Sequence, residues 1–496
     1  MSVRVLMLGW EFPPFVTGGL GTACYGLTKA MDRAGMNVSF VLPKAVRSSE
    51  SSHVQILSPG LEMGEVIHDF KPPPKQHQKT LSFETIEAMP QDTRYTLVQE
   101  MREMFKSVNF VDLPMEVDSS YAPTTVIRRI LEEQLSEQRM QVLLEAGAFG
   151  KTTTSMIRDA QNSIDDVDED DLIHTSPSAP GKAETAADYG GDLLSQTQAY
   201  ARFCVEAARH SEFDVIHAHD WLTFPAGLAV SRISGRPLVV QVHSTEFDRS
   251  GEHVNQPVYN IERRGMHGAV RIIAVSELTK KICVKKYGIN PKKIDVVYNG
   301  VEFETEHISP IETKDKIVLF FGRITMQKGP EYFLEAAKRV LEVEDNVKFV
   351  VAGSGDLAAM MIERAAEMGI GNKVLFTGFL RGRDISRVFS LADLYVMPSV
   401  SEPFGIAPLE AMSHDVPALI SKSSGVSEVL SHALKVDFWD VDEMANKIVA
   451  VLRHAPLRKA LRDNGRFEVR SLTWDGAASR CAKVYEEAIN QIHTSI

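Results

Sequence analysis

Two cationic side chains, Arg323 and Lys328, lie five residues apart, directly after the apolar run 317–321. Pro330 suits the first position of a helix, so the sequence predicts a helix over 331–340 with both cations ahead of its N-terminus. A guanidinium offers a planar fork and an ammonium a point charge, and the helix end adds positive partial charge. This combination matches a diphosphate. The alternative is that both are ordinary surface cations.

A second phosphate candidate is the run Gly18-Gly19-Leu20-Gly21, which follows the strand predicted over 3–8 and precedes a helix predicted over 22–34. Backbone N–H groups in such a turn can approach an anion, although a tight turn that only needs positive φ looks the same. The run fits neither G-x-G-x-x-G nor a P-loop with its Lys-Ser/Thr, which argues against NAD binding and ATP hydrolysis.

Two carboxylates follow the strand predicted over 394–397. Glu410 falls within the next predicted helix, where a carboxylate can accept paired hydrogen bonds from the vicinal hydroxyls of a ribose. Glu402 falls in the loop before that helix and is expected to face whatever lies above the sheet. The alternative is a capping acid and a surface acid.

Three histidines end two predicted strands: His217 and His219 in one, and His243 in the next. A zinc site is disfavoured because His217 and His219 are i, i+2 and no third ligand is evident, so we expect no metal. Hydrogen bonding to a polar substrate is the better interpretation. Gly353 and Gly378 end two further strands, and each is either a point of close ligand approach or a turn.

Short β-branched runs alternate with helical patterns throughout, which predicts parallel strands joined by crossover helices. The first set starts at residue 3, and the pattern restarts near residue 317 after an acidic linker over 301–315. We therefore expect an α/β chain with two Rossmann-like, doubly wound parallel sheets and a cleft at their join. The predicted domains are 1–300 and 301–475, followed by a C-terminal helical segment over 476–496.

Between residues 46 and 201 the alternation breaks down, and we interpret this region as an insertion, part helix and part loop. A helix is predicted over 125–144. The acidic run 165–171 is interpreted as a solvated surface segment rather than a metal or partner site.

Composition limits the remaining classes. The 496 residues carry a formal charge of −12, which argues against a nucleic-acid partner. Four widely separated cysteines predict neither disulfides nor a zinc cluster, which fits a cytoplasmic protein. Neither a signal peptide nor an apolar run of about 18 residues is seen, so no transmembrane segment is expected.

Taken together, these segments resemble the GT-B glycosyltransferases of family 4 and the related glycogen and starch synthases. The resemblance rests on the run 10–20, the run 217–221, Gly322-Arg323 with Gln327-Lys328-Gly329, and the Glu402/Glu410 pair in an E-x7-E frame. It covers nearly the whole chain except the insertion. The resemblance implies retaining transfer of a sugar, with glucose expected, from a UDP-, ADP- or GDP-sugar to an acceptor such as an α-glucan.

The resemblance also implies roles for residues. Arg323 and Lys328 would neutralise the diphosphate in place of a metal ion, so no cofactor is expected. Glu410 would hold the ribose and Glu402 the donor sugar. The implied catalytic set is His243, Asp220 and Glu402, and the implied donor-binding set is Gly18, Gly19, Arg323, Lys328, Gly353, Gly378, Phe379, Leu380, Phe404, Gly405, Ile406 and Glu410.

One position departs from the pattern. Glycogen and starch synthases have lysine two residues before the glycine pair, where this chain has Val16. The departure puts ADP-glucose use and glucan elongation in question. A lipid or small-metabolite acceptor, and a non-catalytic nucleotide-sugar-binding module, therefore stand as alternatives.

Overall fold

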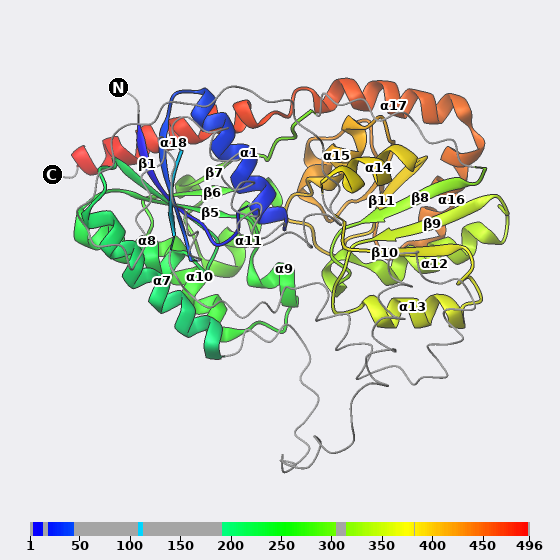
Figure 1. Ribbon diagram of the computed structural model, residues 1–496, viewed down its shortest axis with the longest axis horizontal. Coiled ribbons are helices and arrows are strands. Elements are labelled where there is room, and N and C mark those ends of the chain that lie inside the picture. Colours follow the sequence, from blue (N-terminus) through cyan, green and yellow to red (C-terminus); the bar gives the residue numbers. More distant parts are fainter. Residues whose placement is uncertain are drawn as a thin grey trace, which may run out of the picture.

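The computed structural model describes residues 3–12, 18–43, 108–112, 191–303, 314–380 and 382–494. These residues form two β-sheets, and every strand pair in both is parallel. The chain therefore has the predicted α/β architecture with two Rossmann-like sheets. In Figure 1 the two sheets belong to two lobes that lie side by side.

The first sheet has the order β3-β2-β1-β4-β5-β6-β7. Strands after β1 are added first on one side of it and then, from β4 onward, on the other, so the topological switch point lies between β1 and β4. Its strands are β1 (Arg4–Leu8), β2 (Asn37–Leu42), β3 (Val108–Asp112), β4 (Val215–His219), β5 (Leu238–Val242), β6 (Arg271–Ala274) and β7 (Ile294–Val296). Open parallel sheets bind ligands at such a switch point, outside the carboxyl ends of the strands.

The second sheet has the order β10-β9-β8-β11-β12-β13, with its switch point between β8 and β11. Its strands are β8 (Lys316–Phe321), β9 (Val347–Ala352), β10 (Val374–Gly378), β11 (Leu394–Met397), β12 (Ala418–Ser421) and β13 (Leu434–Val436). Most strand residues are buried, because helices cover both faces.

Helices connect the strands of both sheets. The α-helices of the first lobe are α1 (Gly19–Arg33), α7 (Gly191–Arg209), α8 (Phe224–Ser234), α9 (Glu246–Ser250), α10 (Gln256–Gly268) and α11 (Glu277–Tyr287). Those that follow are α12 (Pro330–Leu341), α13 (Ala358–Glu367), α14 (Arg383–Leu391), α15 (Ala407–Ser413), α16 (Val441–Arg453), α17 (Ala455–Val469) and α18 (Trp474–Thr494). Three short 3-10 helices are η2 (Pro291–Lys293), η3 (Met326–Lys328) and η4 (Gly425–Glu428).

Each sheet has a core on both faces. In the first lobe, α1 and α18 cover one face, and α7, α8, α10 and α11 cover the other. In the second lobe, α12, α13 and α16 cover one face, and the core on the other face includes residues of α14 and α15. None of the described helices is both long enough and apolar enough to cross a membrane.

Helix α18 crosses back from the second lobe to the first, as Figure 1 shows. It contacts α1, β4, β5 and β6, and its residues Cys481, Tyr485 and Ala488 are buried in the core of the first lobe. Val301, in the predicted linker, forms an isolated parallel bridge with Thr473 directly before α18. The lobes are thus joined by two adjacent chain crossings.

One predicted boundary was wrong. The helix predicted over 22–34 begins at Gly19 and ends at Arg33, with Gly18 as its N-cap. Gly19 is therefore the first helical residue, and its N–H belongs to the helix end itself. The insertion predicted over 46–201 contains parts of the first lobe itself, because β3 (Val108–Asp112) pairs with β2 and α7 begins at Gly191. Most of the rest, including the helix predicted over 125–144 and the acidic run 165–171, lies outside the described residues.

The contact between α1 and α18 yields a stability prediction. A Cβ added to Gly26 would lie 2.3 Å from the Trp474 indole, so Gly26→Ala must displace the first residue of α18. We expect a loss of about 1–3 kcal/mol in the free energy of unfolding, despite the better helix propensity of alanine. Gly476→Ala is the control, because its Cβ would meet only an ordinary contact at 3.6 Å. Urea denaturation of both variants tests this, and equal stability would contradict the proposed packing constraint.

Candidate functional site

The candidate site lies where the carboxyl ends of both sheets meet. From the first lobe come the residues after β1, β4 and β5 and the start of α1; from the second come the loops after β8, β9, β10 and β11. Parallel strands place their carboxyl ends along one edge, which is why residues distant in sequence converge here.

Lys328 and Glu402 form an ion pair within the second lobe. Lys328 ends η3, and Gly329 follows with φ of 63°, a conformation that favours glycine. The Glu402 side chain is 8% exposed and also accepts a hydrogen bond from Ser399 Oγ at 3.2 Å. The resemblance implies that Lys328 binds the diphosphate and Glu402 the sugar, and the structure places the two side chains in direct contact.

Arg323 lies close enough to the opposite lobe to act on Glu11. Burial raises the pKa of the Glu11 carboxyl, and the positive charge of Arg323 opposes that rise. Arg323 acts in the same direction on Asp356, whose pKa burial also raises. The Arg323 guanidinium is exposed and lies within electrostatic reach of a carboxylate from each lobe.

Glu11 belongs to this site, although sequence reasoning gave it no role. The backbone N–H of Gly21, in the first turn of α1, hydrogen-bonds to its carboxylate and lowers its pKa, whereas Glu11 Oε2 is buried without a partner. A Cβ on Gly18 would lie 2.6 Å from Glu11 Oε2, so the carboxylate would have to shift if this glycine carried a side chain. Gly19 has nothing within 4 Å of an added Cβ and is open to a ligand.

His219 and His243 are hydrogen-bonded to each other, with Nδ1 of His219 2.9 Å from Nε2 of His243. The His217 ring lies 4.2 Å from the His219 ring, centroid to centroid, and its Nδ1 is 2.6 Å from the hydroxyl of Tyr485. Burial lowers the pKa of His217 and of His243 to about 3 and that of His219 well below its usual value. All three rings are therefore neutral at neutral pH.

Asp220 holds the backbone at His243. Its Oδ1 accepts the N–H of His243 at 2.7 Å and that of Ser244 at 3.3 Å. Burial raises the pKa of Asp220 to about 7, and the nearby Arg249 opposes the rise. Asp220 also has a φ of 58°, which is uncommon for a non-glycine residue and marks a strained position at the strand end.

Glu410 lies in the first turn of α15, as predicted, and lines a pocket of about 530 Å³. The pocket is shared between the lobes, because Thr22 and Tyr25 of α1 face Arg383 of α14 and Glu410 across it. Ile406 also lines it. The geometry therefore places Glu410 beside a cavity rather than on a solvated helix face.

The remaining predicted glycines differ in what they do. A Cβ on Gly353 would lie 1.8 Å from the Gly322 carbonyl, so this glycine serves the packing of two loops rather than close ligand approach. Its N–H donates to the Gly378 carbonyl at 2.9 Å, which links the ends of β9 and β10. Gly405 has a φ of 100° and lies between the buried Phe404 and the half-buried Ile406. Phe379 and Leu380 follow β10 and are half-buried.

Three sets of hydrogen bonds hold the lobes together beside the groove. Ser401 Oγ donates to Asp248 Oδ1 at 2.6 Å, and Ser276 Oγ donates to the Pro403 carbonyl at 2.6 Å. The Glu428 carboxylate accepts the first two N–H groups of α11, those of Glu277 and Leu278, at 2.9 and 2.7 Å. Ser401 and Pro403 flank Glu402 in the loop after β11, whereas no sequence motif indicated Asp248, Ser276 or Glu428.

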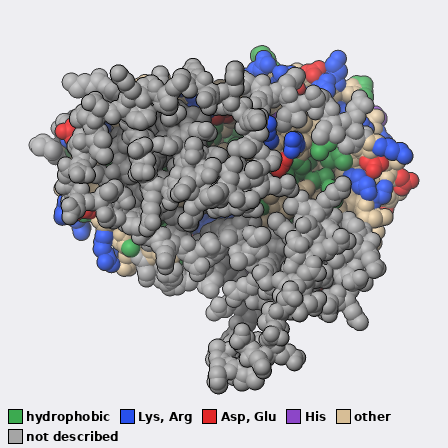
Figure 2. Space-filling view, in the orientation of Figure 1, with side chains coloured by type: hydrophobic (Ala, Val, Ile, Leu, Met, Phe, Trp, Pro, Cys, Tyr) green, Lys and Arg blue, Asp and Glu red, His purple; other side chains and the backbone are tan. Residues whose placement is uncertain are grey.

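The charge of the site is local. Figure 2 shows Lys and Arg side chains mixed with Asp and Glu on the visible described surface of the second lobe. Within the described part of the chain, no group of three His, Cys, Asp or Glu side chains is arranged to hold a metal ion.

Family models match three consecutive parts of the chain. Residues 302–467 match the glycosyl transferases group 1, residues 185–305 match Glycosyltransferase Family 4, and residues 4–111 match the starch synthase catalytic domain. The first match contains Arg323, Lys328, Glu402 and Glu410.

Individual proteins give the same picture. The chain is 32% identical over 302 residues to an uncharacterized glycosyltransferase of Methanocaldococcus jannaschii, covering 57% of this chain and 77% of that one. It is 29% identical over 263 residues to the UDP-Gal:alpha-D-GlcNAc-diphosphoundecaprenol alpha-1,3-galactosyltransferase of Escherichia coli, covering 49% and 67%. The fold is similar to Anabaena HepE in complex with UDP-glucose, with a TM-score of 0.60, 15% identity and coverage of 99% and 100%.

Asp220 yields a pH prediction. Its pKa is about 7 in the folded protein and about 3.9 in the unfolded chain, so the folded state retains a proton that the unfolded state releases. The free energy of unfolding of the wild type therefore falls as pH rises from about 4 to about 7. Asp220→Asn removes this fall because asparagine does not titrate. We expect the variant to gain about 1–3 kcal/mol relative to wild type between about pH 4.5 and pH 8.

Asp214→Asn is the control, because pairing with Arg4 lowers the Asp214 pKa, so this carboxyl is ionised in both the folded and the unfolded state above about pH 4.5. The stability of this variant relative to wild type should therefore stay nearly constant between about pH 4.5 and pH 8. Urea unfolding at both pH values measures the two trends, and a pH-independent Asp220→Asn difference would contradict the assignment.

Proposed function

The chain belongs to the GT-B glycosyltransferases of family 4, and on that premise we propose that it transfers glucose from a nucleotide-sugar donor to an acceptor hydroxyl with retention at the anomeric carbon. The observation that carries the proposal is that one loop of the second lobe holds both cations: Lys328 contacts Glu402, and Arg323 acts on Glu11, whose carboxylate is bonded to the first turn of α1 in the other lobe. No metal ion is needed in this scheme.

The donor's nucleoside diphosphate binds mainly to the second lobe. Arg323 and Lys328 bind the diphosphate oxygens, and the N–H groups at Gly18 and Gly19 approach it from the first lobe. Glu410 accepts hydrogen bonds from the ribose in the shared pocket. Gly378, Phe379 and Leu380 frame the base, and Gly353 supports them through the loop packing described above.

The sugar lies between the two lobes. Glu402 binds its hydroxyls together with the backbone of residues 404–406. His243 donates a hydrogen bond from the opposite wall, and Asp220 fixes the backbone that carries His243. Since Glu402 and Lys328 are in contact, the sugar and the diphosphate that they bind would lie next to each other.

The reaction breaks the bond between the anomeric carbon and the diphosphate oxygen, and forms a bond from that carbon to the acceptor oxygen. The acceptor proton leaves with the nucleoside diphosphate. Negative charge grows on the departing diphosphate, and fixed cations with a helix N-terminus stabilise that charge without reorganisation. Closure of the lobes excludes water and limits hydrolysis of the donor.

Two acceptors have specific support. The match of residues 4–111 to the starch synthase catalytic domain supports an α-glucan. The Escherichia coli relative is named for a lipid-linked diphosphate acceptor, which supports a lipid-linked sugar. Val16 in place of the synthase lysine weighs against glucan elongation with ADP-glucose.

A donor and acceptor screen separates these acceptors. UDP-, ADP- and GDP-sugars are tested by thermal shift, and the best donor is tested for release of nucleoside diphosphate with glucan and with lipid-linked acceptors. Donor binding without release in the presence of any acceptor would favour a non-catalytic binding module.

Lys328→Ala is expected to lower turnover at least about a hundredfold, because one missing charge donor at a developing anion typically costs a few kcal/mol of barrier. Nucleoside diphosphate release at saturating donor is the measurement. Lys338→Ala, on the exposed face of α12, is the matched control and should retain wild-type turnover. Near-normal turnover by folded Lys328→Ala would remove Lys328 from this role.

Metal removal is expected to leave the rate largely unchanged, because Arg323 and Lys328 supply the positive charge at the diphosphate. Initial rates are measured with the purified enzyme before and after EDTA treatment and with added Mg²⁺. Loss of activity in EDTA with recovery on metal addition would contradict this charge assignment.

A further inference from the structure

The bonded pair His219 and His243 has a feature that the roles given above do not use. The alternation of β4 places His217 and His219 on one sheet face, and that of β5 places His243 on the same face. His219 is fully buried, whereas His243, one residue past β5, is partly exposed at the groove. The hydrogen bond between the two rings therefore joins a fully buried histidine to one that a ligand can reach.

The hydrogen bonding determines where the proton lies on each ring. A neutral imidazole has one N–H and one acceptor nitrogen, and the hydrogen bond at one nitrogen sets the state of the other. His219 Nε2 is buried and has no partner. A buried N–H without an acceptor is rarer in native proteins than an under-satisfied acceptor, so the His219 proton belongs on Nδ1.

We propose that His219 is a positioning residue that donates from Nδ1 to Nε2 of His243 and thereby fixes the His243 proton on Nδ1, the nitrogen left to bind the donor. The distance of 2.9 Å between the two nitrogens is that of a good hydrogen bond. Within the described part of the chain the His243 ring is bonded only at Nε2, and the residue is partly exposed, which leaves Nδ1 for a ligand. This inference rests on the proposed function of His243.

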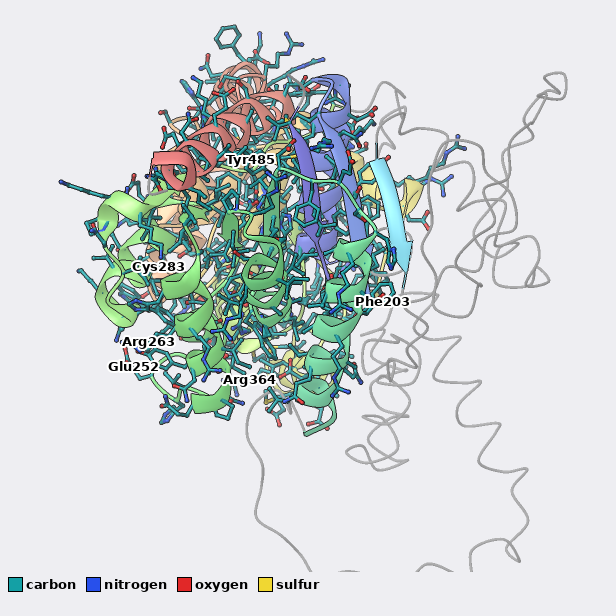
Figure 3. All side chains as sticks on the ribbon, turned by 90° about the vertical axis from the view of Figure 1, so that its left-hand side faces the viewer. Phe203, Glu252, Arg263, Cys283, Arg364 and Tyr485 are labelled. Carbon is teal, nitrogen blue, oxygen red and sulfur yellow. The ribbon has the colours of Figure 1, made fainter. Side chains whose placement is uncertain are left out.

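Helix α18 holds the back of this arrangement. Tyr485 of α18 is fully buried, and its hydroxyl contacts His217, whose ring packs against His219. Figure 3 shows Tyr485 on the side of α18 that faces the strands of the first lobe. The His219 ring is therefore packed on one side by His217 and bonded on the other to His243, which leaves it little freedom to rotate.

The backbone of His243 is held independently of its ring. Asp220 Oδ1 accepts the N–H groups of His243 and Ser244, so the main chain stays in place when the bond from His219 is removed. A change at His219 is thus expected to act on the His243 ring and its proton rather than on the path of the loop.

The first test is the tautomer itself. The full-length protein is labelled with ¹⁵N-histidine, the ring nitrogens are observed by long-range ¹H–¹⁵N NMR, and His243→Gln identifies the signals of His243. We expect wild type to have the His243 proton on Nδ1. In His219→Phe, which keeps a ring but has no nitrogen, this preference should be lost. A wild-type His243 protonated on Nε2, or a tautomer unchanged in His219→Phe, would overturn the proposal.

The second test is kinetic and uses a matched pair of variants. His219→Phe should lower kcat/KM for the donor about tenfold, the effect of losing one neutral hydrogen bond. His219→Asn, whose amide N–H can take the place of Nδ1–H, should recover most of that loss and restore the tautomer. Thermal unfolding of both variants reports the structural cost. A loss equal in both variants would reduce His219 to a packing role and contradict the proposal.

The two tests separate this inference from the proposed function. If the tautomer depends on His219 but no donor is turned over, the proposed function fails and the ring arrangement stands. If the chain transfers sugar while His243 carries its proton on Nε2, the proposed function stands and this inference fails.

Discussion

The site depends on holding two cations at a groove in a protein with a net charge of −12. Lys328 is held by Glu402 within its own lobe, and Arg323 lies within the field of Glu11 from the other lobe. These neighbouring carboxylates offset the cost of placing the cations in a partly buried groove.

The parallel topology brings short motifs that are distant in sequence together at one edge of the sheet. The loops after β8, β9, β10 and β11 all end at the same sheet edge, and the packing of Gly353 on Gly322 fixes the distance between two of these loops. Hydrogen bonds at Ser276, Ser401 and Glu428 then align this edge with that of the first lobe. The residue type determines what each side chain can bind, whereas the two sheets determine where it lies relative to the others.

Much of the fold could be predicted from the sequence, because buried parallel strands give continuous apolar runs and Pro330 marks a helix start. Glu410 and the two cations could also be placed, since each follows a strand at a fixed offset. Glu11 could not, because its role arises only when the missing Cβ of Gly18 lets the carboxylate reach α1. Asp248 likewise acquires its partner Ser401 from 153 residues away, and no periodicity indicates such a contact.

The crossing of α18 has a consequence for the order in which the chain acquires its cores. The second lobe is nearly contiguous in sequence, so its strands and helices are all available once residue 469 has been synthesised. The first lobe, although begun at β1, has only α1 over the sheet face that carries Val5, Met7 and Val215 until α18 is made. Domains tend to fold as units during synthesis. We therefore expect the later-encoded lobe to complete its core before the earlier-encoded one.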